Sequence, residues 1–175
     1  MQSVKVVVSG PFNAGKTTFI KAVSEISVLS TERRVSEGAG EGGGETTVAM
    51  DFGRITITDD IVLYLFGTPG QERFSFMWET LSEGMLGFVL LLDGTSPQQV
   101  TDASSMIEFF RDMSEVPFVV AANRVESEDT EALALLRADL ELEDSVPLMA
   151  VDARDKESVK LVLVGLLTEI LKSMD

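Results

Sequence analysis

One stretch of this sequence, residues 10–17, restricts the fold more than any other part of the chain. It matches the pattern G-x-x-x-x-G-K-[ST] in full and follows an apolar, β-branched run at residues 4–9. From Lys16 onward, apolar residues recur at helical spacing. In such a strand–loop–helix unit, backbone N–H groups and the positive end of the helix dipole converge on phosphate. A chance match in a chain this short has a probability on the order of one percent, judged from average residue usage. The sequence therefore predicts a phosphate-binding loop, or P-loop.

Each part of this loop has a candidate role in holding a nucleoside triphosphate and a magnesium ion. In loops of this pattern the lysine, here Lys16, reaches the β- and γ-phosphates, and the hydroxyl of Thr17 binds Mg²⁺. The other contacts come mainly from backbone N–H groups, which small residues allow to converge. The candidate nucleotide-binding residues here are Gly10, Phe12, Asn13, Ala14, Gly15, Lys16, Thr17 and Thr18.

Beyond the P-loop, strand-like and helix-like segments alternate to the end of the chain. Strands are expected at residues 4–9, 48–58, 61–66, 87–93, 117–123 and 146–151. Helices are expected at residues 16–25, 71–82, 97–113, 130–140 and 156–171. This alternation predicts a single α/β domain over residues 1–175, with helices on both faces of a six-stranded, mostly parallel sheet. A hairpin makes the strand at 48–58 antiparallel to its neighbour.

The segment between the first helix and the second expected strand has a different composition. Residues 38–44 contain five glycines, whose backbone is costly to order. We therefore expect residues 30–46 to form a mobile loop inside the domain. Within the strand that follows, Gly53 is a candidate for a β-bulge.

The composition excludes several classes of function. The sequence has no Cys and no His, which excludes disulfides, thiolate nucleophiles, the usual zinc sites and His-based acid–base catalysis. A net charge of −15 argues against nucleic acid or an anionic membrane as the partner, although a local phosphate site tolerates it. No apolar run approaches the ~20 residues that span a membrane, and neither a signal peptide nor a lipidation motif is visible. We expect a cytoplasmic protein without an intrinsic membrane anchor.

From the P-loop onward, the sequence resembles the Ras-like small GTPases, and the resemblance covers nearly the whole chain. It implies a G domain that binds GTP, GDP and Mg²⁺ and acts as a molecular switch. Residues 47–52 are similar to the end of switch I in Rab-type members, where Thr47 would bind Mg²⁺, sense the γ-phosphate and assist catalysis. A mobile loop that ends in a hydroxyl suits this role, because phosphate orders it and hydrolysis releases it. The alternative is that Thr46 and Thr47 only open a β-strand.

Residues 66–74 resemble the switch II segment of the same family. The resemblance implies that the backbone N–H of Gly70 binds the γ-phosphate and that Gln71 orients the attacking water. Gly67 stands where the family has an Asp that supports Mg²⁺ through a water molecule. The nearest carboxylate that could replace it is Asp51, on the neighbouring expected strand.

Residues 121–126 resemble the base-recognition motif N-K-x-D, with two substitutions. Asn123 matches, Arg124 replaces Lys and Glu126 replaces Asp. The Glu126 carboxylate can accept hydrogen bonds from guanine, and Arg124 can stack on the base. The alternative is that Asn123 only ends a strand. A second segment resembles the last motif of the family and adds the candidate base contacts Asp152, Ala153 and Arg154.

Two further features bear on hydrolysis and on partners. Phe12 and Asn13 occupy positions that are Gly in Ras, and a bulky side chain there could obstruct an incoming arginine or displace Gln71. The amino-acid sequence at residues 46–53 and 66–74 is most similar to that of prokaryotic Ras-like GTPases. These include conservon GTPases and relatives of the gliding-polarity protein MglA. This resemblance implies a regulatory partner of the roadblock/LC7 type. Arginine fingers could come from the chain itself, at Arg33, Arg34 or Arg73.

Three functions remain open at this level. The first is a GTPase switch whose hydrolysis is slow without a partner. The second is a P-loop kinase or ATPase, which shares the P-loop and is kept open by Glu126. The third is an interaction module that binds nucleotide with little hydrolysis. An apolar cluster after switch II, either core or a partner surface, comprises Phe74, Phe76, Met77 and Trp78.

Overall fold

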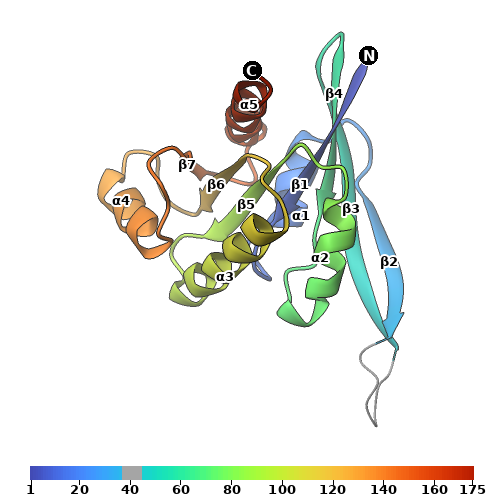
Figure 1. Cartoon of the computed structure of the whole chain (residues 1–175), viewed down its shortest axis with the longest axis horizontal. Coiled ribbons are helices and arrows are strands. Elements are labelled where there is room, and N and C mark those ends of the chain that lie inside the picture. Colours follow the sequence, from blue (N-terminus) through green and yellow to red (C-terminus); the bar gives the residue numbers. More distant parts are fainter. Residues whose placement is uncertain (37–44) are drawn as a thin grey trace.

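A computed structural model gives the arrangement of residues 1–36 and 45–175 (Figure 1). For residues 30–36 and 45–49 it describes the backbone alone. The strands are β1 (Gln2–Ser9), β2 (Leu29–Ser36), β3 (Glu45–Thr58), β4 (Ile61–Gly67), β5 (Gly87–Asp93), β6 (Phe118–Asn123) and β7 (Leu148–Val151). The helices are α1 (Lys16–Val23), α2 (Ser75–Ser82), α3 (Pro97–Met113), α4 (Thr130–Asp139) and α5 (Lys156–Ser173), and a 3₁₀ turn, η1 (Glu72–Phe74), precedes α2.

These strands form one sheet in the order β2-β3-β4-β1-β5-β6-β7. The β1–β4, β1–β5, β5–β6 and β6–β7 pairs are parallel, whereas β3 runs antiparallel to both β2 and β4. The predicted α/β class is confirmed, with all six expected strands present and one of them antiparallel. Such a doubly wound sheet binds ligands outside the carboxyl ends of its strands, where the strand order reverses. Here that point is β1, which lies between β4 and β5.

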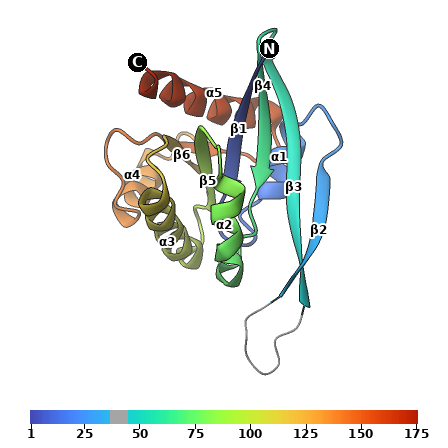
Figure 2. The ribbon, with the colours of Figure 1, turned by 45° about the vertical axis from the view of Figure 1, so that its right-hand side comes forward.

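Helices cover both faces of the sheet, as the alternating pattern predicts (Figure 2). Along β1, Val6 and Val8 face the side covered by α1 and α5, and Val7 faces the side covered by α2, α3 and α4. The two cores are therefore separated by the sheet itself. Large side chains fill both of them, because Phe19 of α1 and Phe110 of α3 are completely buried.

Three of the helices, α3, α4 and α5, begin where a short polar side chain caps a free N–H group. Ser96 accepts from the N–H of Gln99 at the start of α3, and Pro97 occupies the first turn. Asp129 and Asp155 cap α4 and α5 in the same way. The caps explain why α3 and α5 begin at the residues expected from the sequence.

The prediction for residues 30–46 is wrong in part. Residues 30–36 lie in β2, whose backbone pairs with β3 from Leu29↔Phe52 to Ser36↔Glu45, so the sheet has a seventh strand. The residues of this strand include β-branched ones, which suit an edge strand, but the glycines that follow dominate the composition of the segment. The glycines at 38–44 lie outside the described residues.

The β-bulge expected at Gly53 is not there. Gly53 pairs in regular register with Leu65, and the irregularity in the β3–β4 pairing falls between Thr56 and Thr58. A Cβ atom at Gly53 would lie 2.5 Å from Cγ2 of Ile20 on α1. This glycine therefore allows close packing of helix on sheet, not a break in the ladder.

Candidate functional site

The candidate site lies at the carboxyl ends of β1, β5, β6 and β7. The P-loop follows β1, Asp93 ends β5 and Asn123 ends β6. Asp152 and Ala153 follow β7 directly. Parallel strands bring these ends to one edge of the sheet, so segments more than 100 residues apart in the sequence meet there.

Lys16 is held against the backbone of the P-loop. Its Nζ donates to the carbonyl oxygens of Gly10 and Pro11, at 2.6 and 2.8 Å. Burial among these groups lowers the pKa of Lys16 to about 8, although the nearby Asp51 carboxylate acts in the opposite direction. Phosphate oxygens would favour the charged form of such an ammonium group, so the site suits an anion.

Asp51 lies beside the P-loop, next to Thr17, the candidate metal ligand. The Thr17 hydroxyl donates to Asp51 Oδ2 at 2.5 Å. Asp51 is also the cross-strand partner of Gly67, and a Cβ atom at Gly67 would come within 3.2 Å of Asp51 Cβ. The Asp51 side chain thus occupies the space beside Gly67, the position at which Ras-like GTPases carry their Asp. A hydroxyl next to a carboxylate supplies the hard oxygen ligands that Mg²⁺ prefers.

The loop at residues 67–71, called the switch II loop for its resemblance to that segment, lies directly on the P-loop. A Cβ atom at Gly70 would be 2.4 Å from the backbone N of Phe12 and 2.7 Å from Lys16 Nζ. The loop is anchored at the other end by the indole of Trp78, which donates to the carbonyl of Pro69 at 2.6 Å. Only glycine fits position 70 in this arrangement, because any side chain would strike P-loop backbone.

Gln71, the next residue, lines a cavity beside the P-loop, called here the phosphate-side cavity. Its Oε1 accepts a 2.7 Å hydrogen bond from Arg73 Nε. The cavity has a volume of about 780 Å³, and its wall includes Asn13, Lys16, Thr17 and Gln71. The structure therefore brings the candidate phosphate, metal and catalytic residues of the P-loop and switch II to one place. Arg73 packs over the ring of Phe74, 4.6 Å from its centroid.

Asn123 connects the base side of the site to the P-loop. Its Nδ2 donates to the carbonyl of Ala14 at 3.1 Å, and its Oδ1 accepts from the N–H groups of Ala153 and Arg124 at 3.3 and 3.1 Å. The side chain is buried and uses donors and acceptor together. One amide thus fixes the P-loop, the end of β6 and the segment after β7 relative to one another.

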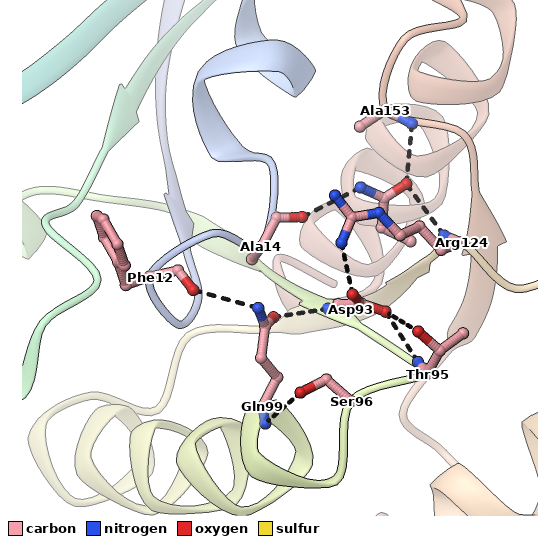
Figure 3. Close-up of polar contacts among 9 residues, drawn as sticks. Phe12, Ala14, Asp93, Thr95, Ser96, Gln99, Arg124 and Ala153 are labelled. Carbon is pink, nitrogen blue, oxygen red and sulfur yellow. Dashed lines mark hydrogen bonds and ion pairs between the residues drawn. The ribbon is translucent and has the colours of Figure 1, made fainter.

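Arg124 lines both cavities of the site and forms an ion pair with Asp93. Its Nη1 lies 2.5 Å from Asp93 Oδ2, and its backbone has a φ of 66°. Burial by itself would raise the pKa of Asp93, but hydrogen bonds from Thr95 and from Arg124 outweigh it and hold that pKa below its usual value. The carboxylate therefore stays charged between Thr95 and Arg124 (Figure 3).

A third side chain in this network, Gln99, was not expected from the sequence. Its Oε1 accepts from the N–H of Asp93 at 2.8 Å, and its Nε2 donates to the carbonyl of Phe12 at 3.2 Å (Figure 3). The sequence indicates no role for Gln99 or Asp93, because neither residue belongs to a recognised motif. A buried strand that ends in Asp93 was the one available signal.

The expected base contacts surround a second cavity, of about 470 Å³. Glu126, Asp152 and Arg154 line this cavity, and Arg154 Nε donates to Asp152 Oδ1 at 3.0 Å. This hydrogen bond is the main reason that the pKa of Asp152 lies below its usual value. The cavity wall also contains Gly15, Thr18, Asn123, Arg124 and Ala153.

The remaining candidates are Thr47, the two arginines of β2 and the apolar cluster after switch II. The backbone of Thr47 lies within β3, opposite Arg34, and the side chains of Thr47, Arg33 and Arg34 are outside what the structure describes. Their proposed roles therefore stay predictions. Of the apolar cluster after switch II, the residues that pack inside are Phe74, Met77 and Trp78, whereas Phe76 is exposed.

Comparison with known proteins places the chain in a family. A sequence model of the family described as "Conserved hypothetical ATP binding protein" matches residues 30–173, which is most of the chain. The chain belongs to that family. The part of the chain that the family model matches begins after the P-loop. It contains the switch II segment and the base side of the site.

Two relatives of this family member cover most of its length. An uncharacterized protein of Methanocaldococcus jannaschii, MJ1339, is 32% identical over 126 residues, which is 72% of this chain and 73% of the relative. The Ras-related protein Rab-27B of Bos taurus is 25% identical over 186 aligned residues, or 98% of this chain and 81% of the relative. These similarities and the P-loop identify a nucleotide-binding P-loop protein related to the GTPases. Within the described residues, no helix could cross a lipid bilayer.

Proposed function

We propose that this protein is a GTP-binding molecular switch that hydrolyses GTP to GDP and phosphate. The observation that carries the proposal is the position of Asn123, whose amide joins Ala14 of the P-loop to Ala153 at the base cavity. A phosphate site and a base site are thereby built as one unit. The whole-length similarity to a Ras-related protein supports the same reading.

The ligands fit the residues that line the two cavities. Lys16 and the N–H groups of the P-loop would hold the phosphates, and Glu126 and Ala153 would contact the base. Thr17 and Thr47 would hold Mg²⁺, with Asp51 as the supporting carboxylate in place of the missing Asp at position 67. When bound, the metal ion would neutralise charge on the β- and γ-phosphates.

Hydrolysis would use Gln71 to orient a water molecule toward the γ-phosphorus. Arg73, which donates to Gln71 Oε1, restrains that side chain and is a candidate arginine finger. Phe12 is exposed beside this position, so a bulky ring borders the approach of any arginine from a partner. We expect slow hydrolysis by the protein alone, accelerated by a partner.

The switch would operate through the contact between switch II and the P-loop. Gly70 lies against the backbone of Phe12 in the present conformation. A γ-phosphate at Lys16 would have to displace this loop or be enclosed by it, so di- and triphosphate states would differ at residues 67–71. The similarity to prokaryotic Ras-like GTPases suggests a regulator of the roadblock/LC7 type that reads this difference.

An ATPase or kinase is the second candidate, and two observations favour it. The family is described as ATP-binding, and Glu126 replaces the shorter Asp of the guanine-specific motif. The extra methylene of Glu126 changes the reach of the side chain, which keeps ATP open, but its carboxylate would still accept from the N1–H and amine of guanine. We therefore rank GTP first.

The test is a competition experiment on the nucleotide-free protein with Mg²⁺. Fluorescent GDP or GTP is bound and then displaced by unlabelled GTP or ATP, and phosphate release is followed with each triphosphate. Displacement by GTP but not by ATP supports the GTPase. This preference for GTP should be lost in Glu126→Ala and kept in the exposed control Glu128→Ala. Equal displacement by both nucleotides would mean a general NTPase. Binding of neither would overturn the nucleotide site, and binding without phosphate release would leave an interaction module.

A further inference from the structure

Gln99 connects the P-loop to the end of β5 through both ends of its side-chain amide. It is buried at the start of α3, where the cap from Ser96 fixes its backbone N–H. The amide accepts from the N–H of Asp93 at 2.8 Å and donates to the carbonyl of Phe12 at 3.2 Å (Figure 3). No motif of the nucleotide-binding site includes this residue.

The chemistry of its two neighbours settles the orientation of this amide. The N–H of Asp93 can only donate, and the carbonyl of Phe12 can only accept. Oε1 must therefore face Asp93 and Nε2 must face Phe12, because the reversed amide would bring two donors together at one end and two acceptors at the other. Gln99 Nε2 can therefore keep its hydrogen bond only while the carbonyl of Phe12 points toward it.

That carbonyl belongs to the central peptide of a turn in the P-loop. The N–H of Ala14 donates to the carbonyl of Pro11 at 3.1 Å, which closes a turn with Phe12 and Asn13 in the middle. Asn13 has a φ of 69°, the left-handed value that a type II turn requires at its third residue and that Asn accepts readily. A type I turn would have a negative φ there and the central peptide reversed.

The direction of this peptide decides where the N–H of Asn13 points. In a trans peptide the carbonyl and the next N–H point to opposite sides. Because the carbonyl of Phe12 faces Gln99, the N–H of Asn13 points away from α3. Asn13 lines the cavity that contains Lys16 and Thr17, which is the phosphate side of the site.

We propose that Gln99 is a positioning residue that holds the Phe12–Asn13 peptide in its type II orientation and so presents the N–H of Asn13 to the phosphates of the nucleotide. The inference rests on the proposed nucleotide binding and deepens it. The hydrogen bond to the Phe12 carbonyl comes from Gln99, whereas Arg124 Nη1 donates to Asp93. Asp93 in turn meets Gln99 through its N–H and Arg124 through its carboxylate, so the base side and the phosphate side share one network.

The test uses the full chain with Mg²⁺ and GDP and compares two pairs of variants. Gln99→Glu keeps the acceptor for Asp93 but places a carboxylate oxygen against the carbonyl of Phe12. Gln99→Met keeps the length of the side chain and removes both hydrogen bonds. Gln98→Glu and Gln98→Met make the same chemical changes at the adjacent exposed residue. Dissociation of fluorescent GDP gives the rate, and the ³¹P resonance of the bound β-phosphate reports its hydrogen bonds.

We expect both Gln99 variants to release GDP roughly tenfold faster, the effect of losing one hydrogen bond to a charged group, and to shift the β-phosphate resonance. Both Gln98 variants should keep the original rate and resonance. A lower melting temperature of the nucleotide-free Gln99 variants with an unmoved resonance and rate would make Gln99 a purely structural residue and overturn the inference. If the unsubstituted protein binds no GDP, GTP or ATP, the proposed function itself fails. If it binds GDP and the Gln99 variants have the same GDP dissociation rate and β-phosphate resonance as the unsubstituted protein, this inference alone fails.

Discussion

The hydroxyl of Thr17 donates a 2.5 Å hydrogen bond to Asp51 Oδ2, and Asp51 is at the same time the cross-strand partner of Gly67. A carboxylate thus reaches the metal side of the P-loop from β3, one strand away from the position where Ras-like GTPases carry it. In the proposed function, Asp51 on the neighbouring strand takes the place of the Asp that is missing at position 67.

Asp51→Asn should weaken the Mg²⁺-dependent part of nucleotide binding. Residues that orient a metal ligand typically change metal affinity by about 10- to 100-fold, and a loss in this range is expected. The measurement is the GDP dissociation rate as a function of Mg²⁺ concentration, with the exposed Asp59→Asn as control. An unchanged Mg²⁺ requirement in Asp51→Asn would contradict the assignment.

Restoring the family's Asp by Gly67→Asp should harm the protein. The added Cβ would lie 3.0 Å from Ile20 Cδ1 and 3.2 Å from Asp51 Cβ, so the new carboxylate would be crowded and close to an existing one. We expect a lower melting temperature and weaker nucleotide binding, by thermal denaturation and GDP titration. Tighter Mg²⁺-dependent binding in this variant would show that Asp51 is not the substitute.

Gly70→Ala should separate binding from turnover. The methyl group would meet the backbone of Phe12 at 2.4 Å, so the switch II loop must move and carry Gln71 with it. We expect GTP hydrolysis to fall by at least about tenfold while GDP still binds through the P-loop and the base cavity. Single-turnover phosphate release and GDP titration on the same preparation measure the two effects. Equal hydrolysis in both proteins would mean that Gly70 does not position Gln71.

The pKa of Lys16 predicts a stability profile for the protein without nucleotide and metal. The folded state releases the Lys16 proton near pH 8, whereas the unfolded chain keeps it up to the ordinary value of 10.5. Between these values the unfolded state binds more protons, so stability rises with pH. At about 1.4 kcal/mol for each pKa unit, the gain in the free energy of unfolding is at most roughly 3–4 kcal/mol, and screening by solvent makes it smaller.

The measurement is urea denaturation of the nucleotide-free protein at several values between pH 7.5 and pH 10.5, the window set by the pKa of Lys16. Lys16→Met should be more stable at pH 7.5 and should lack this part of the rise. Lys21→Met, on the exposed side of the same helix, is the matched control and should keep it. A rise of the same size in all three proteins would assign it to other groups.

Asn123→Ala should destabilise the protein even when no nucleotide is present. The substitution leaves the carbonyl of Ala14 and the N–H of Ala153 without their partner. An unsatisfied buried polar group costs about 1–3 kcal/mol, so we expect a loss of roughly 2 kcal/mol. Urea denaturation of the nucleotide-free protein measures it, with the exposed Gln98→Ala as reference. A loss confined to nucleotide affinity would show that Asn123 has no structural role.

Several parts of the site were predictable because they depend on short stretches of chain. The P-loop at residues 10–17 has a fixed spacing, and the apolar runs around it fix a strand and a helix. The caps of α3 and α5 are likewise local, and those helices begin where expected. Asp51 was predicted as the substitute carboxylate because hairpin pairing can be read from the turn between two adjacent strands.

Other parts depended on contacts between distant segments. Residues 30–36 become the edge strand β2 because β3 offers a free edge, which composition alone does not reveal. Gly53 is explained by Ile20 on α1, and Gln99 by the carbonyl of Phe12, 87 residues away. Each of these pairs is brought together by the packing of helices on the sheet.

The sequence by itself determined the alternating α/β domain, the P-loop and the candidate residues after β1, β4, β6 and β7, but not Asp93 at the end of β5. Periodicity and motif spacing act over a few residues, so a single chain records them directly. Only the tertiary structure decided that Arg124 pairs with Asp93, that Gln99 holds the P-loop and that Gly70 lies on Phe12. Those contacts join different strand ends of one sheet, and their geometry exists only once the sheet has formed.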